Sequence, residues 1–504
     1  MSDPSAGRGG GGRVEGGLTG RLVRLAPPPW LAVGAAVTFG VIGCRPIGDV
    51  DIYWQVKLGD VMLAAGTPFI TEPFLAHRAG LAHEPICWLS QVILALVRRA
   101  GDWQAVRVFD ALLLTGGFLA ICWPAALRLR DWPRGWVALL AGGAGLFCIA
   151  PYTTVRPQTF TVFAWGLLLA VYFANLRPGP KILSAALVCL FWQNCHPSIG
   201  VAAVFLGTAA GAGWVRYLRK RRAGPPWVET AIVFVAAVSQ LATPAGFAIF
   251  PIAQMNRHMC TDIFPISEWL PITDPRNLPR SFAELRNQPG SLHGLGIAAA
   301  TAALVAWRRR RVRWEEVMPA AAAFAACFYA SRFTLLLAPA VVPIWVRCLT
   351  PPGAERSPDN APISATLGRI RWAIFLGLMA VAAAVPFVLR PKLDAAYPFP
   401  YAGIEALKKR HVSGTIYVYY LWGGIVSDLG YPQWKVSHDG RYYLHTDRDW
   451  YDYFDDDMDA FEAFHPVGVI LDQNYDKKMI QKLRKNPEYE QIHEDKLAAT
   501  FVRR

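Results

Sequence analysis

The sequence predicts an all-α, polytopic membrane bundle of about eleven transmembrane helices, followed by a small soluble α/β domain at the C-terminus. Three observations predict this fold class. Hydrophobic residues make up 53% of the 504 residues and charged residues only 17%, whereas charged residues are about 25% of an ordinary globular domain. The apolar residues form long blocks, separated by short runs of Lys and Arg. Residues 391–504 instead alternate short strand and helix patterns.

The apolar blocks define the transmembrane domain, residues 28–390. A helix needs about 20 apolar residues to cross the hydrocarbon, and somewhat fewer where the bilayer thins. Eleven segments qualify, several of them short: 28–47, 105–127, 136–151, 159–175, 182–195, 198–215, 228–247, 291–307, 316–331, 333–348 and 372–389. The Gly-rich residues 1–27 are expected to form a disordered cytoplasmic N-terminus.

The basic runs predict the orientation of this bundle in the cell (inner) membrane. With the N-terminus in the cytoplasm, every basic cluster falls on the cytoplasmic side, as the positive-inside rule requires. The strongest clusters are 216–222 and 308–313. An odd number of spans then places residues 391–504 on the periplasmic or extracellular side.

The net charge and the cysteine spacing argue against other classes of protein. The net charge of +14 does not predict nucleic-acid binding, because the Lys and Arg residues sit between apolar segments rather than in one basic patch. None of the nine cysteines forms a CxxC pair, and residues 391–504 contain none. This pattern argues against a structural zinc site and a disulfide-stapled domain.

Two loops on the outer side are long. The first, 48–104, contains two helical patterns, Tyr53–Ala65 and Pro85–Arg99, which are too short to span and are expected to lie in the membrane interface. The second, 251–290, is Pro-rich and irregular. In the C-terminal domain the patterns predict strands at 416–421, 434–438, 467–471 and 498–504, and helices at 401–410, 449–463 and 475–486.

An acidic pair stands where the first span meets the outer surface. The string is Gly48-Asp49-Val50-Asp51-Ile52-Tyr53-Trp54. Two carboxylates there can serve as a general base, or can hold a divalent cation such as Mg or Mn together with substrate phosphate oxygens. The alternative is that Asp49 or Asp51 only caps the helix that starts near Tyr53.

Other polar groups fall on the same membrane face, near the ends of predicted spans: Arg156, His196, Glu268 and Arg332. Polar groups at this depth are costly without a partner or a purpose. A guanidinium group binds phosphate in a bidentate manner, so Arg156 and Arg332 are candidate phosphate ligands. The alternative is that each Arg reaches the lipid headgroups or pairs with a loop carboxylate.

A set of ordered motifs resembles bacterial multi-pass proteins of the GT-C glycosyltransferase superfamily. The motifs are GDVDIYWQVKLGDVMLAAGTPFITEPF, WLSQVILAL, VRPQTFTVF, FWQNCHPSIGVA, ATPAGFAIF, ISEWLP, SRFTLLLAP, YLWGGIVSDL and HDGRYYL. This resemblance implies a polyprenyl-phosphate- or pyrophosphate-linked sugar as donor and an acidic residue of the first outer loop in catalysis. It matches Asp49 and Asp51 to the acidic pair.

The same resemblance implies substrate-binding roles at recurrent polar positions, which are matched here by Arg156, His196, Glu268 and Arg332, with Trp54 in the first motif. The chain also departs from the pattern. Gln55 stands where the group often has His, and Cys87-Trp88-Leu89 stands where it often has Glu-Trp-Leu. His83 and Glu84 lie slightly upstream and are further candidate substrate-binding residues.

The function expected on these grounds is inverting transfer of a sugar from a polyprenyl-phosphate lipid to a glycan, lipid or protein acceptor at the outer face, assisted by Asp49 or Asp51. Two alternatives stay open: a transporter or flippase for a lipid-linked sugar, and a non-catalytic envelope-assembly protein. In the C-terminal domain, Trp422-Gly423-Gly424 and Asp439-Gly440-Arg441-Tyr442 indicate tight turns or close backbone approach. The acidic stretch 447–459 favours a solvated helix start.

Overall fold

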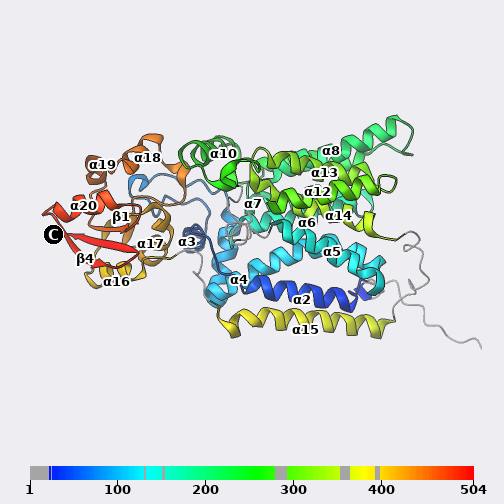
Figure 1. Ribbon diagram of the computed structural model, residues 1–504, viewed down its shortest axis with the longest axis horizontal. Coiled ribbons are helices and arrows are strands. Elements are labelled where there is room, and N and C mark those ends of the chain that lie inside the picture. Colours follow the sequence, from blue (N-terminus) through cyan, green and yellow to red (C-terminus); the bar gives the residue numbers. More distant parts are fainter. Residues whose placement is uncertain are drawn as a thin grey trace, which may run out of the picture.

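The computed structural model describes residues 22–23, 25–129, 132–149, 154–277, 292–351, 364–391 and 398–504. Most of the predicted disordered segment 1–27 lies outside these residues. The molecule is elongated, with a helical bundle at one end and the C-terminal α/β domain at the other (Figure 1). The acidic pair lies at the junction of these two parts.

A helix lies at each predicted span within the described residues. The helices are α2 (Pro29–Gly43), α4 (Trp88–Arg128), α5 (Trp132–Ile149), α6 (Gln158–Phe173), α7 (Pro178–Cys195), α8 (Ile199–Leu218), α9 (Trp227–Val238), α12 (Leu292–Trp307), α13 (Trp314–Cys327), α14 (Thr334–Leu349) and α15 (Ala365–Leu389). In this part of the chain, four helices are long and apolar enough to cross a membrane, or five if one bent pair counts as a span. The number eleven therefore stays a prediction.

Helix α4 joins two expected elements, the interfacial segment 85–99 and the span 105–127. Gly101 and Asp102 have non-helical backbone angles inside it, so the helix is kinked between the two. The other expected interfacial helix is α3, Ile52–Ala65. The predicted boundary between the two elements, residues 100–104, therefore coincides with this kink.

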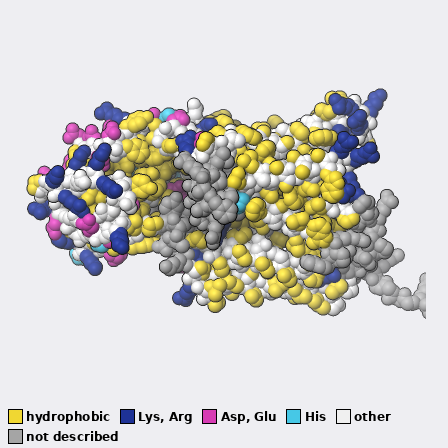
Figure 2. All heavy atoms as spheres, in the orientation of Figure 1, with side chains coloured by type: hydrophobic (Ala, Val, Ile, Leu, Met, Phe, Trp, Pro, Cys, Tyr) yellow, Lys and Arg dark blue, Asp and Glu magenta, His cyan; other side chains and the backbone are white. Residues whose placement is uncertain are grey.

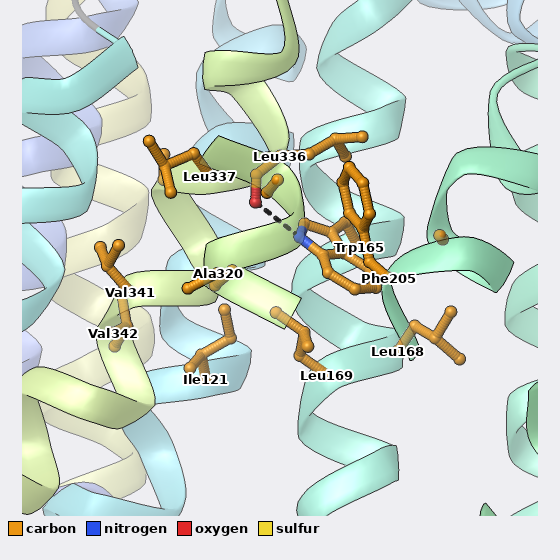
Figure 3. Close-up of a cluster of buried hydrophobic side chains, with 14 of the residues drawn as sticks. Ile121, Trp165, Leu168, Leu169, Phe205, Ala320, Leu336, Leu337, Val341 and Val342 are labelled. Carbon is orange, nitrogen blue, oxygen red and sulfur yellow. Dashed lines mark hydrogen bonds between the residues drawn. The ribbon is translucent and has the colours of Figure 1, made fainter. Parts of the chain in front are cut away.

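The bundle is held together by close helix packing around a dry core. A Cβ atom on Gly166 of α6 would lie 2.3 Å from the carbonyl oxygen of Gly117 on α4, so these two backbones touch. Small residues permit such contact between membrane helices. Trp165 is fully buried in the core, and its indole Nε1 donates a hydrogen bond of 2.8 Å to the carbonyl of Leu336 on α14 (Figure 3).

The outer surface of the bundle is apolar. Figure 2 shows hydrophobic side chains over most of its visible face, with Lys and Arg gathered toward the end far from the C-terminal domain. In α15, only 11% of the most apolar stretch is buried, and Leu376, Val381 and Val388 are among its exposed side chains. These features are those of a helix that faces lipid.

The C-terminal domain is built on a five-stranded mixed sheet with the order β2-β1-β3-β5-β4. The strands are β1 (Gly414–Val418), β2 (Trp434–Val436), β3 (Gly468–Asp472), β4 (Tyr489–Glu494) and β5 (Ala498–Arg503). Strand β1 is parallel to β2 and β3, while β5 is antiparallel to β3 and β4. The helices are α16 (Tyr401–Lys409), α17 (Gly423–Gly430), α18 (Asp447–Phe454), α19 (Met458–Ala463) and α20 (Lys477–Lys485).

The two faces of this sheet have different partners. Successive side chains of a strand point to opposite faces. Tyr417 and Val469 pack with Trp450 of α18 and Phe461 of α19 in one cluster. Ile416, Val418 and Ile470 point the other way, into a cluster that also contains residues of the first outer loop, among them Ile47, Ile52, Tyr53 and Leu75. One continuous core therefore fixes the domain to the bundle.

The first outer loop also covers the edge of the sheet. Leu75 forms an isolated parallel bridge with Val436 of β2, and the Val436 amide donates a hydrogen bond of 2.8 Å to the carbonyl of Phe74. This contact satisfies backbone groups that an edge strand would otherwise expose.

Three expectations for irregular or short elements need correction. The helix expected at 449–463 is two helices, α18 and α19, because Asp457 caps a new start. Strand β4 and helix α17 were not expected, since Tyr489–Glu494 is polar and Gly423–Gly430 begins with two glycines. The loop 251–290, expected to be irregular, contains most of helix α10 (Ile249–His258).

Candidate functional site

The candidate site is built around Asp49 and Asp51, in the turn between α2 and α3. Gly48 has a φ of 66°, a left-handed conformation that glycine adopts without strain. The turn is tied to the loop before α6, because the Val155 amide donates a hydrogen bond of 3.1 Å to the carbonyl of Ile47. The acidic pair is thus held against the helix ends that face the C-terminal domain.

The two carboxylates have different surroundings. Asp49 is buried; its Oδ1 accepts the Asp51 amide at 2.8 Å, and its Oδ2 accepts the Thr154 hydroxyl at 3.3 Å. Asp51 occupies the N-cap position of α3, but its side chain makes no capping hydrogen bond. Its Oδ1 accepts the indole Nε1–H of Trp54 at 3.1 Å instead. The interpretation of the pair as a helix cap alone therefore does not fit.

Asp51 keeps one oxygen free. Among the described residues, Oδ2 of Asp51 has no hydrogen-bond partner, and it is not sealed from solvent. Burial and the neighbouring Asp49 carboxylate raise the pKa of Asp51 to about 8, and burial also raises the pKa of Asp49. The pair therefore holds a proton at pH values where an ordinary carboxyl group is fully ionised.

Arg156 links the acidic pair to the second long loop. Its guanidinium lies 3.3 Å from Oδ2 of Asp49 and forms a two-pronged pair with the carboxylate of Glu268. Burial by itself would raise the pKa of Glu268, but the positive charges of Arg156 and Arg332 outweigh it and lower that pKa. Arg156 is thus already neutralised by two carboxylates.

Arg332 is different, because it makes no ion pair within the described residues. Its guanidinium carbon lies 4.1 Å from the centre of the Trp269 ring, which is a cation–π contact. Ser331 holds the segment in place by donating through its amide to the carbonyl of Leu270 at 2.8 Å and through its hydroxyl to that of Ser267 at 3.1 Å. A positioned, half-buried guanidinium with free donors is suited to an anionic ligand.

His196 adjoins this group of charges from the turn between α7 and α8. Its Nδ1 lies 2.9 Å from the Ser198 hydroxyl, which also accepts the indole Nε1–H of Trp192 at 2.9 Å. Burial lowers the pKa of His196 to about 3, and the charges of Arg332 and Arg156 act in the same direction. His196 is therefore a neutral hydrogen-bonding group at physiological pH.

The C-terminal domain closes over Asp51 from the other side. A Cβ atom on Gly440 would lie 1.7 Å from Oδ1 of Asp51, and one on Gly424 would lie 2.8 Å from the carbonyl oxygen of Val50. Only glycine leaves room for these contacts. Gly424 and Gly440 thus mark close backbone approach to the acidic loop, whereas Gly423 lies against the backbone of His438.

A buried ion network holds this closure in place. Arg441 is 1% exposed and pairs with Asp439 and with Glu72 of the first outer loop, where its Nη1 lies 2.6 Å from Oε2 of Glu72. Glu72 also accepts the amides of Phe74 and Leu75 at 2.9 and 3.1 Å. Sequence reasoning did not assign a role to Glu72, Asp439 or Arg441; only the DGR string drew attention to this place.

Two expected site residues lie elsewhere. His83 is buried beside Glu72, with its Nδ1 3.5 Å from Oε2 of that residue, so it belongs to the ion network. Glu84 is exposed and has no contact with the acidic pair within the described residues. His83 and Glu84 are close in sequence to the second helical pattern, but this does not bring them to the acidic pair. The chain reverses direction between Thr71 and Ala82, which form an antiparallel bridge.

Metal ligation has little support in the arrangement of side chains. Within the described ranges, no group of three or more His, Cys, Asp or Glu side chains is placed to hold a metal ion. Asp49 spends both oxygens on protein donors. A cation at the pair would therefore have the free oxygen of Asp51 as its main protein ligand.

Fold and site together define a multi-pass membrane protein with an acidic pair of raised pKa at one end of its bundle. At the same end lies a guanidinium group that makes no ion pair among the described residues. Neither family models nor curated proteins match the chain. It resembles the solved structures of ArnT from Cupriavidus metallidurans, bound to undecaprenyl phosphate (13% identity, TM-score 0.48, covering 96% of this chain and 98% of that one) and in the apo state (13%, 0.49, 94% and 97%).

A further likeness is to the apo oligosaccharyltransferase of Archaeoglobus fulgidus, with 12% identity and a TM-score of 0.46, covering 88% of this chain and 69% of that one. Both proteins are GT-C glycosyltransferases, the superfamily that the ordered motifs resemble. At TM-scores below 0.5 these likenesses concern the course of the chain alone.

Proposed function

We propose that the protein is a membrane glycosyltransferase that moves a sugar from a polyprenyl-phosphate lipid to an acceptor hydroxyl at the outer face of the cell membrane. The observation that carries the proposal is the convergence of Asp51, Asp49, Arg156, Glu268 and Arg332, from four separate segments, into one site. There, Oδ2 of Asp51 and the Arg332 guanidinium have no hydrogen-bond or ion-pair partner among the described residues. The motif resemblance supports the class of donor.

In the proposed reaction, Asp51 is the general base. Its free oxygen takes the proton of the acceptor hydroxyl. At the same time the hydroxyl oxygen of the acceptor bonds to the anomeric carbon from the face opposite the phosphate. The bond between the anomeric carbon and the phosphate oxygen breaks, so configuration inverts and the polyprenyl phosphate departs. General-base help of this kind is worth about 10²–10⁴-fold in rate. Asp49 is a positioning residue, because both of its oxygens are engaged by protein donors.

Arg332 is assigned to the donor phosphate. Negative charge grows on the phosphate as the bond breaks, and a fixed donor contributes about 3 kcal/mol to such a transition state. Both arginines were expected to serve here, but Arg156 already has two carboxylate partners. The charge it carries is therefore used to hold Asp49 and Glu268 together.

A divalent cation is the alternative source of positive charge. Because Arg332 already provides a free cation and Asp51 only one free oxygen, we propose that transfer needs no added metal. Transfer that stops in EDTA and returns with Mg or Mn would instead assign a bound cation to Asp51.

The experiment that tests the function is sugar transfer in membranes that contain the protein, supplied with radiolabelled polyprenyl-phosphate sugars. Wild type is expected to move label from the lipid fraction to an acceptor, and Asp49→Asn/Asp51→Asn is expected to fold and to move none. Full activity in the double variant would remove the acid–base proposal.

A further inference from the structure

A large cavity lies away from the candidate site, at the other end of the bundle. It has a volume of about 610 Å³ and lies among the last turns of α4, α6 and α14 and the start of α13. Helices α6 and α14 begin next to Arg156 and Arg332 and run 16 residues each. At 1.5 Å per residue, about 24 Å separate the cavity from the acidic pair.

The inner wall of the cavity is apolar. Ile121 of α4, Leu169 of α6 and Val346 of α14 contribute to it. Ile121 and Leu169 are also part of the cluster shown in Figure 3, where they lie below Trp165. This wall continues the dry core of the bundle, because Ile121 and Leu169 belong to the core cluster and Val346 packs against it. A hydrocarbon chain therefore fits this wall better than a water-soluble molecule.

The mouth of the cavity is basic. Four arginines line it, Arg128, Arg311, Arg313 and Arg347, together with a single acid, Glu316. Arg347 and Glu316 form a two-pronged ion pair and cancel each other. Arg311 gives one donor to the Thr350 carbonyl at 2.7 Å, and Arg128 gives its Nε to the Pro124 carbonyl at 3.2 Å. Their other donors, and the exposed Arg313, have no carboxylate partner within the described residues.

We propose that this cavity binds an anionic phospholipid from the leaflet opposite the candidate site. The phosphate headgroup lies between Arg128, Arg311 and Arg313, and one acyl chain lies along Ile121, Leu169 and Val346. Guanidinium groups recognise phosphate through paired donors, and basic pockets between transmembrane helices are suited to anionic lipid headgroups. A zwitterionic lipid brings its own cation and would leave the arginines uncompensated. The inference does not depend on the proposed transferase activity.

The test measures lipid retention by the full-length protein, purified in detergent with equal amounts of phosphatidylglycerol and phosphatidylcholine. The cavity variant is Arg128→Gln/Arg313→Gln, which leaves the Arg347–Glu316 pair intact. The matched control is Arg219→Gln/Arg221→Gln, which removes two exposed arginines of the 216–222 cluster outside the cavity. Native mass spectrometry counts the bound lipid, and thermal unfolding reports the stabilisation by added lipid.

We expect wild type and control to retain phosphatidylglycerol in preference to phosphatidylcholine. The cavity variant should bind phosphatidylglycerol about ten-fold more weakly, since it loses two phosphate-facing charges. Arg128→Lys/Arg313→Lys, which keeps both charges, should recover most of the binding and show that the loss is not misfolding.

Four results would overturn the assignment. If wild type retains the two lipids equally, the cavity does not select an anionic lipid. If the cavity variant and the control bind phosphatidylglycerol equally, the lipid is not bound at this cavity. Inorganic phosphate that raises the unfolding temperature as much as phosphatidylglycerol does would make the cavity a site for a soluble anion. Polyprenyl phosphate that displaces phosphatidylglycerol at lower concentration would make the occupant a carrier lipid.

Discussion

At the scale of single residues, the two acids and the two arginines of the site have separate tasks. Asp49 accepts hydrogen bonds at both oxygens and Arg156 pairs with two carboxylates, whereas Oδ2 of Asp51 and the Arg332 guanidinium have no hydrogen-bond or ion-pair partner among the described residues. A charged group that is paired inside the protein positions its neighbours, and a group with free donors or acceptors can meet a substrate.

The first prediction at this scale concerns pH. Because the pKa of Asp51 is raised to about 8, its base form is scarce at pH 6 and grows as the pH rises through 8. The rate of sugar transfer in proteoliposomes at saturating donor should rise about ten-fold per pH unit below that value. In Asp51→Glu the pH dependence of the transfer rate should shift with the pKa of the new carboxyl group. A transfer rate that does not change between pH 6 and 8 in wild type would contradict a base at this position.

The second prediction separates the two arginines. Arg332→Gln should raise KM for the donor, or lower kcat, by about ten-fold or more while the unfolding temperature stays close to wild type, because no ion pair is lost. Arg156→Gln should leave Asp49 and Glu268 unpaired and destabilise the protein by about 3 kcal/mol. Donor kinetics and thermal unfolding of both purified variants give the comparison, and equal destabilisation by the two substitutions would show that Arg332 is a structural cation.

At the scale of elements, the closure of the C-terminal domain over the acidic loop rests on backbone contact. The Asp439–Arg441 segment lies against Asp51, and Gly424 of α17 lies against Val50. Arg441 fixes this arrangement through Asp439 and Glu72. If the C-terminal domain were displaced from the acidic loop, Asp51 would be the first residue of the site to move.

The prediction at this scale is that Gly440→Ala lowers the transfer rate by about 100-fold, the cost of a misplacement near 1 Å at a reacting group. Gly224→Ala is the matched control, since a Cβ atom there meets nothing within 4 Å. Transfer rates of the two variants at equal protein amounts provide the measurement. If Gly440→Ala transfers sugar as fast as the control does, the C-terminal domain does not position Asp51.

The helices were largely predictable from the sequence, and the closure was not. Long apolar blocks identify a helix whatever surrounds it, which is why each predicted span coincides with one. The acidic pair stood out because two carboxylates at the end of an apolar block are costly. The contact between Gly440 and Asp51 joins positions almost 400 residues apart. In the sequence, only the glycines of DGR and WGG indicated that another part of the chain lies close to this backbone. Strand β4 was missed because its solvent-facing side chains are polar.

At the scale of the whole molecule, one apolar bundle separates two charged ends. The acidic pair and the C-terminal domain occupy one end, and basic runs between α8 and α9 and between α12 and α13 occupy the other (Figures 1 and 2). By the positive-inside rule, the basic end should face the cytoplasm.

The corresponding prediction is tested by labelling introduced cysteines in intact cells with a membrane-impermeant maleimide. Lys496→Cys, in the exposed tip of the C-terminal sheet, should be labelled, whereas Arg221→Cys should be labelled only after the membrane is opened. Seven of the nine native cysteines are buried, which keeps the background low. The reverse pattern would place the candidate site in the cytoplasm.

The central claim, that this site breaks the bond between a sugar and a lipid phosphate, is tested most directly by the mass of the lipid itself. Purified protein in proteoliposomes is given polyprenyl-phosphate sugars and an extract of envelope acceptors, and the lipid is analysed before and after incubation. The account predicts that wild type converts the donor to free polyprenyl phosphate and that Asp51→Asn does not. A donor that crosses the bilayer with its headgroup unchanged, in wild type as in the variant, would contradict the account and favour a transporter.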